Sequence, residues 1–224
     1  MFLWADLVAL VGHPVRALPA IDRERRGVHG AVALGLSVLI PAILAEVAAF
    51  APYRPPAGLG SLPSLTAQGA DIYARWVYQH RIVLPIYEVL AGVFLWLLAA
   101  AAIHVAARAL NGRGDLAGFV KLAGFVALVG LVSVPLTALQ AIARLSANPR
   151  AELSIGSAAA AVGIGVFVWQ NVLLVLAAQA HYGLSTERAV TAVLGPVGCL
   201  VVILFALIVI ATIATVLMRP LGSL

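Results

Sequence analysis

The chain has 224 residues, of which 63% are hydrophobic and 10% are charged, and its mean hydropathy is +1.06. A water-soluble domain of this length needs much less apolar material for its core, so the composition excludes an ordinary soluble protein and indicates an integral membrane protein. The 14 basic and 9 acidic residues give a net charge of +5, but the basic residues are scattered between apolar segments, so nucleic acid is not an expected partner.

Residues 1–27 predict a segment that lies at the membrane interface. Apolar residues recur at near-helical spacing between positions 2 and 20, with Trp4 near one end and Arg16 near the other, a pattern typical of an interfacial helix on the inner leaflet. Pro14 and Pro19 are expected to kink or end this helix. The alternative is a short ordered tail packed on the membrane domain.

Residues 28–218 predict a single transmembrane domain. Five stretches of 19 to 34 residues contain no Asp, Glu, Lys or Arg: 27–45, 89–107, 122–143, 153–186 and 189–218. Each reaches about the 20 apolar residues that cross a bilayer core, and none alternates with period 2, which favours helices over a β-barrel. The predicted fold is therefore all-α, a bundle of about five transmembrane helices. The expected spans lie near 28–52, 83–107, 117–143, 155–181 and 189–218.

The fifth span is too long for a simple crossing, because 30 residues of helix extend about 45 Å against a bilayer core of about 30 Å. Gly195 and Pro196 are the expected place of a break, which leaves roughly 197–218 as the crossing.

The loop at 53–82 is the only long extramembrane connection that the sequence predicts. Its first half is rich in Pro and Gly, whereas its second half carries Asp71, Arg75, Trp76 and His80 in a pattern that favours an amphipathic helix at an interface. We expect this helix, centred on Trp76, to dock against lipid headgroups or a partner protein.

The basic residues also give an orientation. Eight of them fall on the side of the N-terminus when spans are counted alternately, and six fall on the other side. The positive-inside rule then predicts a cytoplasmic N-terminus.

Two short turns between spans have a clear physical logic. Gly112 and Gly114 permit positive φ where a helix stops and reverses, and Arg113 lies at the headgroup level between them. Ser185 or Thr186 is a suitable N-cap for the last helix.

These turns also carry a family resemblance. The first occurs in AIHVAARALNGRGDLAGFVKLAGF, and the second, with Gly183, ends an aromatic-led stretch from Trp169, VWQNVLLVLAAQAHYGLSTERAV. Over roughly residues 5–215 the chain resembles the Yip family of Rab-interacting-type membrane proteins, in which such turns occur in this order within five spans. The resemblance implies a non-enzymatic role in organising membranes.

Eukaryotic members of that family carry a long cytosolic N-terminal region with an acidic, aromatic motif, for which the first 27 residues offer no counterpart. Binding of Rab-type GTPases is therefore not expected. The Ala-, Gly- and Arg-rich composition is more similar to bacterial members, which implies a bacterial inner membrane location.

Three ionisable residues inside the predicted spans are candidate polar sites: Glu46, Glu88 and His104. Glu46 and Glu88 lie near the outer ends of the first two spans, at similar depth, so they could face each other. An ion pair, a carboxyl pair that shares a proton and a cation site are the functional hypotheses, and separate structural pairing is the alternative. His104 has no second ligand at i±3 or i±4, which favours a packed or interfacial histidine. Trp4, Trp76 and Trp169 are expected to act as interface anchors.

No catalytic, metal or nucleotide-binding fingerprint occurs in the sequence, so neither enzymatic activity nor a cofactor is expected. The first functional hypothesis is a scaffold or accessory subunit of a larger membrane complex, or a membrane-organising factor, with lipids and other integral subunits as partners and a homo-oligomer as one possible form. The second is a small transporter or channel that uses Glu46 and Glu88.

Overall fold

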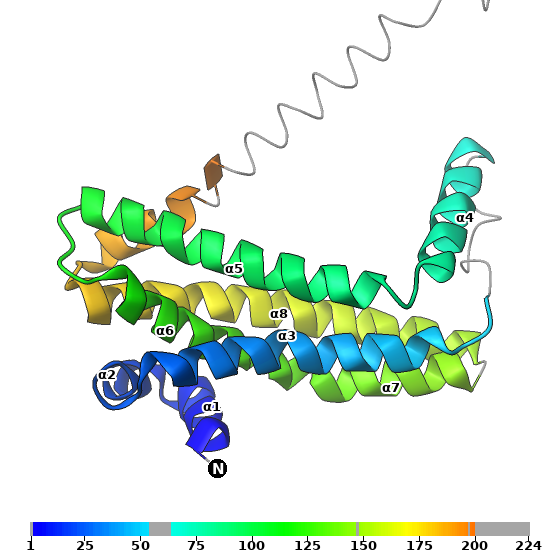
Figure 1. Cartoon of the computed structure of the whole chain (residues 1–224), viewed down its shortest axis with the longest axis horizontal. Coiled ribbons are helices and arrows are strands. Elements are labelled where there is room, and N and C mark those ends of the chain that lie inside the picture. Colours follow the sequence, from blue (N-terminus) through cyan, green and yellow to red (C-terminus); the bar gives the residue numbers. More distant parts are fainter. Residues whose placement is uncertain (1, 54–63, 147, 197, 200–224) are drawn as a thin grey trace, which may run out of the picture.

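A computed structural model of the chain describes residues 2–53, 64–146, 148–196 and 198–199. Within these residues the regular structure is helical, and four helical stretches are long and apolar enough to cross a membrane. Figure 1 shows these spans running lengthwise through the molecule, with two short helices below one end and one helix standing across the other end. The prediction of an all-α polytopic membrane protein is confirmed. The predicted crossing at 197–218 lies almost entirely outside the described residues.

The N-terminal segment forms two short helices rather than one. Helix α1 covers Phe2–Gly12 and helix α2 covers Pro14–Glu24, and they separate at His13 because Pro14 starts the second helix. Pro19 lies within α2 and does not end it. The Arg25 guanidinium, just after α2, donates to both carboxylate oxygens of Asp6 at 2.9 and 3.0 Å and so fixes the two helices together.

Helix α3, the first span, covers Gly27–Ala49 and packs closely against α6, which covers Leu116–Leu128. A Cβ at Gly124 would lie 2.2 Å from the carbonyl oxygen of Gly30, and a Cβ at Gly30 would lie 2.5 Å from that of Lys121. Only two glycines allow backbones to approach so closely, which is the usual way in which helices pack in lipid.

Helix α5 covers Leu84–Ala109 and forms the second span. The third span consists of α6, the 3-10 helix η2 at Val129–Ser133 and α7 at Val134–Leu145. It is the central element, because 44% of its most apolar stretch is buried, against 11–17% for the other three spans. The indole N–H of Trp96 on α5 donates to the α6 carbonyl of Ala123 at 2.9 Å.

Helix α8, the fourth span, covers Pro149–Tyr182 and is followed by a helix over residues 186–196. Helix α4 covers Ser64–Gln79 in the predicted extramembrane loop and begins earlier than the aromatic segment that indicated it. The hydrophobic core joins α1, α2, α3, α5, α6, the last part of α8 and residues 189–193. Its largest buried side chains lie toward one end of the bundle: Leu10, Leu18, Phe119, Leu122, Phe125 and Tyr182.

Candidate functional site

Two turns that are far apart in the sequence lie against each other at one end of the bundle, which we call the turn end. Residues 110–115 join α5 to α6, and residues 183–185 follow α8. The backbone N–H of Arg113 donates to the carbonyl of Tyr182 at 3.1 Å and connects the turns directly. These are the segments that carry the family resemblance.

Glycine is needed in the first turn for space rather than for backbone angle. The expectation that Gly112 and Gly114 use positive φ is wrong, because among the described residues positive φ occurs only at Asn111 and Gly183, with 67° and 68°. A Cβ at Gly112 or Gly114 would instead lie 2.9 or 2.7 Å from side-chain atoms of Tyr182. A larger residue at either position would push the turn away from α8.

The carboxylate of Asp22 ties helix α2 to two spans. Its Oδ1 lies 3.0 Å from the ammonium of Lys121 on α6, and its Oδ2 lies 3.0 Å from Nδ1 of His181 on α8. Burial alone would raise the pKa of Asp22, but the hydrogen bonds from His181 and Lys121 outweigh it and hold the pKa below its ordinary value of 3.8. Asp22 is therefore an anion at neutral pH, and it bridges three helices.

His181 extends this network to the first turn. Its Nε2 lies 2.8 Å from the backbone carbonyl oxygen of Asp115, whose carboxylate accepts from the N–H of Gly118 at 2.8 Å and caps α6. The hydrogen bond from Gly118 holds the pKa of Asp115 below its ordinary value. The two ring nitrogens of His181 thus contact one oxygen from α2 and one from the first turn.

His104 joins the same region through a partner that the sequence did not indicate. Its Nδ1 lies 2.8 Å from the hydroxyl of Tyr182, which is 2% exposed and packs its ring 5.2 Å from that of Phe119. The interaction is a hydrogen bond between α5 and α8, which fits the expectation of a packed histidine. We call the six side chains the turn cluster: Asp22, His104, Asp115, Lys121, His181 and Tyr182.

The two glutamates lie at the opposite end of the bundle, which we call the loop end because α4 lies there (Figure 1). Glu46 lines a groove of about 370 Å³ between α3 and α5, whereas Glu88 is exposed on α5 and does not line it. Neither carboxylate has a hydrogen-bond or ion-pair partner within the described part of the chain. The structure thus places them at one end without bringing them together there.

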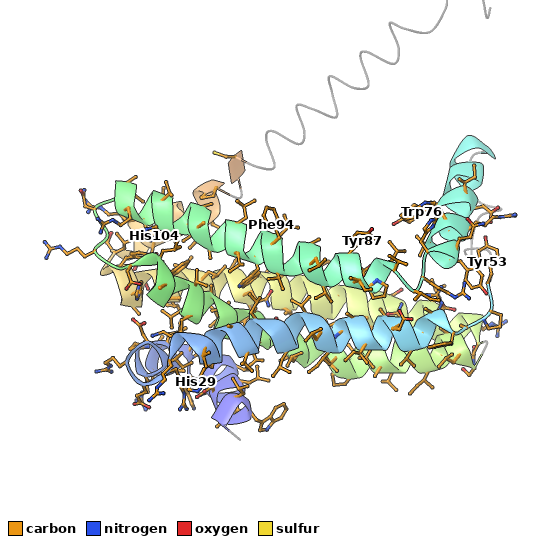
Figure 2. All side chains as sticks on the ribbon, viewed as in Figure 1. His29, Tyr53, Trp76, Tyr87, Phe94 and His104 are labelled. Atoms are coloured by element: carbon orange, nitrogen blue, oxygen red, sulfur yellow. The ribbon has the colours of Figure 1, made fainter. Side chains whose placement is uncertain are left out.

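Helix α4 contacts Tyr53 at the loop end and carries an aromatic surface. The hydroxyl of Tyr53 donates to Asp71 at 2.6 Å, and Arg75 donates to the same carboxylate at 2.9 Å. The hydrogen bond from Tyr53 is the main reason that the pKa of Asp71 is lowered. The ring of Trp76 packs against that of His80 in a tilted arrangement, with ring centres 4.7 Å apart. Figure 2 shows Tyr53 and Trp76 together at this end, far from His104 and His29.

The remaining sequence candidates have separate places. Trp4 on α1 is 71% exposed, whereas Trp169 on α8 packs against the core. Trp169 lies thirteen residues before the end of α8, which corresponds to about 20 Å along the helix axis from that end. Its buried indole N–H has no hydrogen-bond partner within the described residues. Ser185 immediately precedes the helix at 186–196, as expected for an N-cap, and its carbonyl accepts from Ala189 at 2.9 Å. The hydroxyl of Thr186 accepts from Gln179 at 2.8 Å.

A second groove, of about 650 Å³, lies between α8 and the helix at 186–196. It is mainly apolar, and its polar groups are the amides of Asn171 and Gln179 and the hydroxyl of Thr186. The described residues that line the two grooves include no pair of a nucleophile with a base, and none of them belongs to the turn cluster defined above.

The turn cluster itself is suited to holding helices together. Its side chains bond to one another and to backbone carbonyls across α2, α5, α6 and α8. Among the described residues, no group of three or more His, Cys, Asp or Glu side chains is arranged to hold a metal ion. No local sequence pattern indicated Asp22, Lys121 and His181, because their partners lie 66 to 159 positions away in the sequence. The available signal was that each lies beside one of the two turns or the first span.

Comparison with known proteins gives one match. The model of the Yip1 domain family matches residues 8–210, which include every element described above from α2 to the helix at 186–196. No curated protein and no solved structure matches the chain.

Proposed function

Because the chain belongs to the Yip1 domain family of membrane proteins, we propose that it is a non-enzymatic scaffold or accessory subunit that organises other components within the bilayer. The observation that carries the proposal is that the side chains of the turn cluster do not line either groove. The side chains of the turn cluster bond to other groups within the protein. The two grooves are lined mainly by apolar side chains, with one carboxylate in the first groove and two amides and a hydroxyl in the second. Such surfaces bind rather than catalyse.

The faces of the spans support the same proposal. Large apolar side chains are exposed along α5, and Tyr87 and Phe94 stand on its outer side (Figure 2). These faces need lipid tails or the apolar helices of other subunits around them. Asn171 is one of the polar groups of the mainly apolar groove beside α8. Its amide N–H donates to Phe167 in the same helix, and its carbonyl oxygen can accept a hydrogen bond from a neighbouring helix.

The proposal includes a location and an orientation. Arg23, Arg25 and Arg26 lie at the turn end together with Arg108 and Arg113, and a cytoplasmic turn end agrees with the positive-inside rule. The composition favours the inner membrane of a bacterium. The transporter hypothesis gains no support from the described residues, because only one of its two glutamates lines a groove.

The test is a purification from native membranes. The chain is tagged at its N-terminus, expressed at its natural level and extracted in a mild detergent, and the copurifying proteins are quantified by mass spectrometry against an unrelated tagged polytopic protein. A defined set of membrane subunits in stoichiometric amounts is the expected result. Isolation of the chain alone, with no enriched membrane protein, would contradict a scaffold role.

A further inference from the structure

The groove between α3 and α5 at the loop end combines an apolar lining with one carboxylate. Aliphatic side chains of both helices form its walls, among them Leu39 and Ile43 on α3 and Ile86 and Leu90 on α5. Three of these are about 60% exposed, so the groove opens sideways, toward the space that lipid fills. Among the described residues, Glu46 is the only charged one that lines it.

The depth of Glu46 matches the boundary between headgroups and acyl chains. Helix α3 has 23 residues, so it is about 34 Å long and only slightly longer than a hydrocarbon core of about 30 Å. Glu46 lies three residues, or about 5 Å, before the end of the helix. The apolar wall continues from Glu46 to Leu39, over about two turns toward the bilayer centre.

A carboxylate at this depth selects for a cation. Within the described residues Glu46 has no protein partner, and leaving a charge in an apolar groove is costly unless it is paired. A primary ammonium supplies positive charge and three hydrogen-bond donors, and a charge-assisted hydrogen bond to a carboxylate is among the stronger ones. An attached acyl chain would cover the aliphatic wall below.

We propose that this groove binds a phospholipid with a primary ammonium in its headgroup, such as phosphatidylethanolamine, and that Glu46 holds the ammonium while an acyl chain lies between α3 and α5. Anionic lipids are disfavoured at the same place by repulsion from the carboxylate. The inference goes beyond the proposed scaffold role, because lipid selectivity and association with other subunits are measured separately.

Glu88 provides a matched control. It is also a glutamate near the loop end of a span, but it is exposed on α5 and does not line the groove. Glu46→Gln and Glu88→Gln therefore remove the same charge from similar depths, and only the first removes it from the groove. Ile43→Trp is a second variant, which fills the groove and leaves Glu46 in place.

The experiment uses the full chain in detergent, titrated with phosphatidylethanolamine, phosphatidylcholine or phosphatidylglycerol, and counts retained lipids by native mass spectrometry. Wild type and Glu88→Gln should retain phosphatidylethanolamine about five- to tenfold more strongly than phosphatidylglycerol, with phosphatidylcholine, which lacks N–H donors, in between. Glu46→Gln should lose this preference, and Ile43→Trp should weaken retention of all three lipids.

Three results would overturn the inference. The first is equal retention of the three lipids by wild type, and the second is an equal loss of preference in Glu46→Gln and Glu88→Gln. The third is a wild-type protein that is dimeric without added lipid and a Glu46→Gln variant that is monomeric. That result would assign the groove to a second copy of the chain. Size-exclusion profiles of the variants establish that each is folded before the lipids are compared.

Discussion

The two ends of the bundle use their charged residues in opposite ways. At the turn end, Asp22 forms an ion pair with Lys121 and contacts His181 across three helices, and Gly30 and Gly124 bring α3 against α6. At the loop end, α3 and α5 leave a groove between them, and the described residues offer Glu46 no partner. The same helix α3 contributes to both ends, so its small residues and its neighbours determine which end is closed and which is open.

Gly124→Ala should give the largest effect, because the added methyl group meets the backbone of Gly30 rather than a side chain that can move. We expect a loss of about 3 kcal/mol, the upper range for overpacking. Gly35→Ala on α3 is the control, since a Cβ there meets nothing within 4 Å. Thermal stability in detergent, followed by size-exclusion chromatography, measures both; equal behaviour of the two variants would show that the α3 and α6 backbones are not in close contact.

Asp22→Asn should come next. The substitution leaves Lys121, whose side chain is 10% exposed, without its anionic partner, and we expect a loss of about 2 kcal/mol. Glu24→Gln removes a charge from the exposed side of the same helix and should change stability little. If both variants melt at the same temperature, Asp22 does not tie α2 to the spans.

Acid should weaken the turn end through the same carboxylate. Because the pKa of Asp22 is lowered in the folded protein, its contribution is complete above the ordinary value of 3.8 and is lost as the pH falls below it. Wild type should therefore lose thermal stability more steeply than Asp22→Asn as the pH falls below 3.8. Parallel pH profiles of thermal stability for the two proteins would show that ionisation of Asp22 does not stabilise the fold.

Tyr53→Phe should have the smallest effect, because it removes a single, part-buried hydrogen bond to Asp71 at the loop end, outside the hydrophobic core. Global stability should stay unchanged, while α4 becomes more sensitive to proteases. Tyr73→Phe, on the exposed face of the same helix, is the control. An unchanged cleavage rate for Tyr53→Phe would mean that other contacts hold α4.

The spans were predictable from the sequence, and the contacts between them were not. The charge-free stretches predicted both ends of α3, of α5 and of α6 with α7 to within a few residues. They also predicted the end of α8, but α8 begins six residues before the expected start at 155. The pairing of Asp22 with His181 depends on folding across 159 positions, which no local pattern reports. Gly112 and Gly114 were identified correctly as turn residues but for the wrong reason, because their role depends on the proximity of Tyr182 in space.

The turn cluster should hold α2 firmly against the spans, whereas α4 should be held weakly. Hydrogen exchange of the full chain in lipid nanodiscs tests this difference most directly. Both helices lie outside the predicted spans, so the bilayer does not shield one more than the other. We predict slow exchange in α2, fast exchange in α4, and acceleration of α2 alone in Asp22→Asn. Equal exchange of α2 and α4 in wild type, or an α2 that Asp22→Asn leaves unchanged, would contradict this prediction.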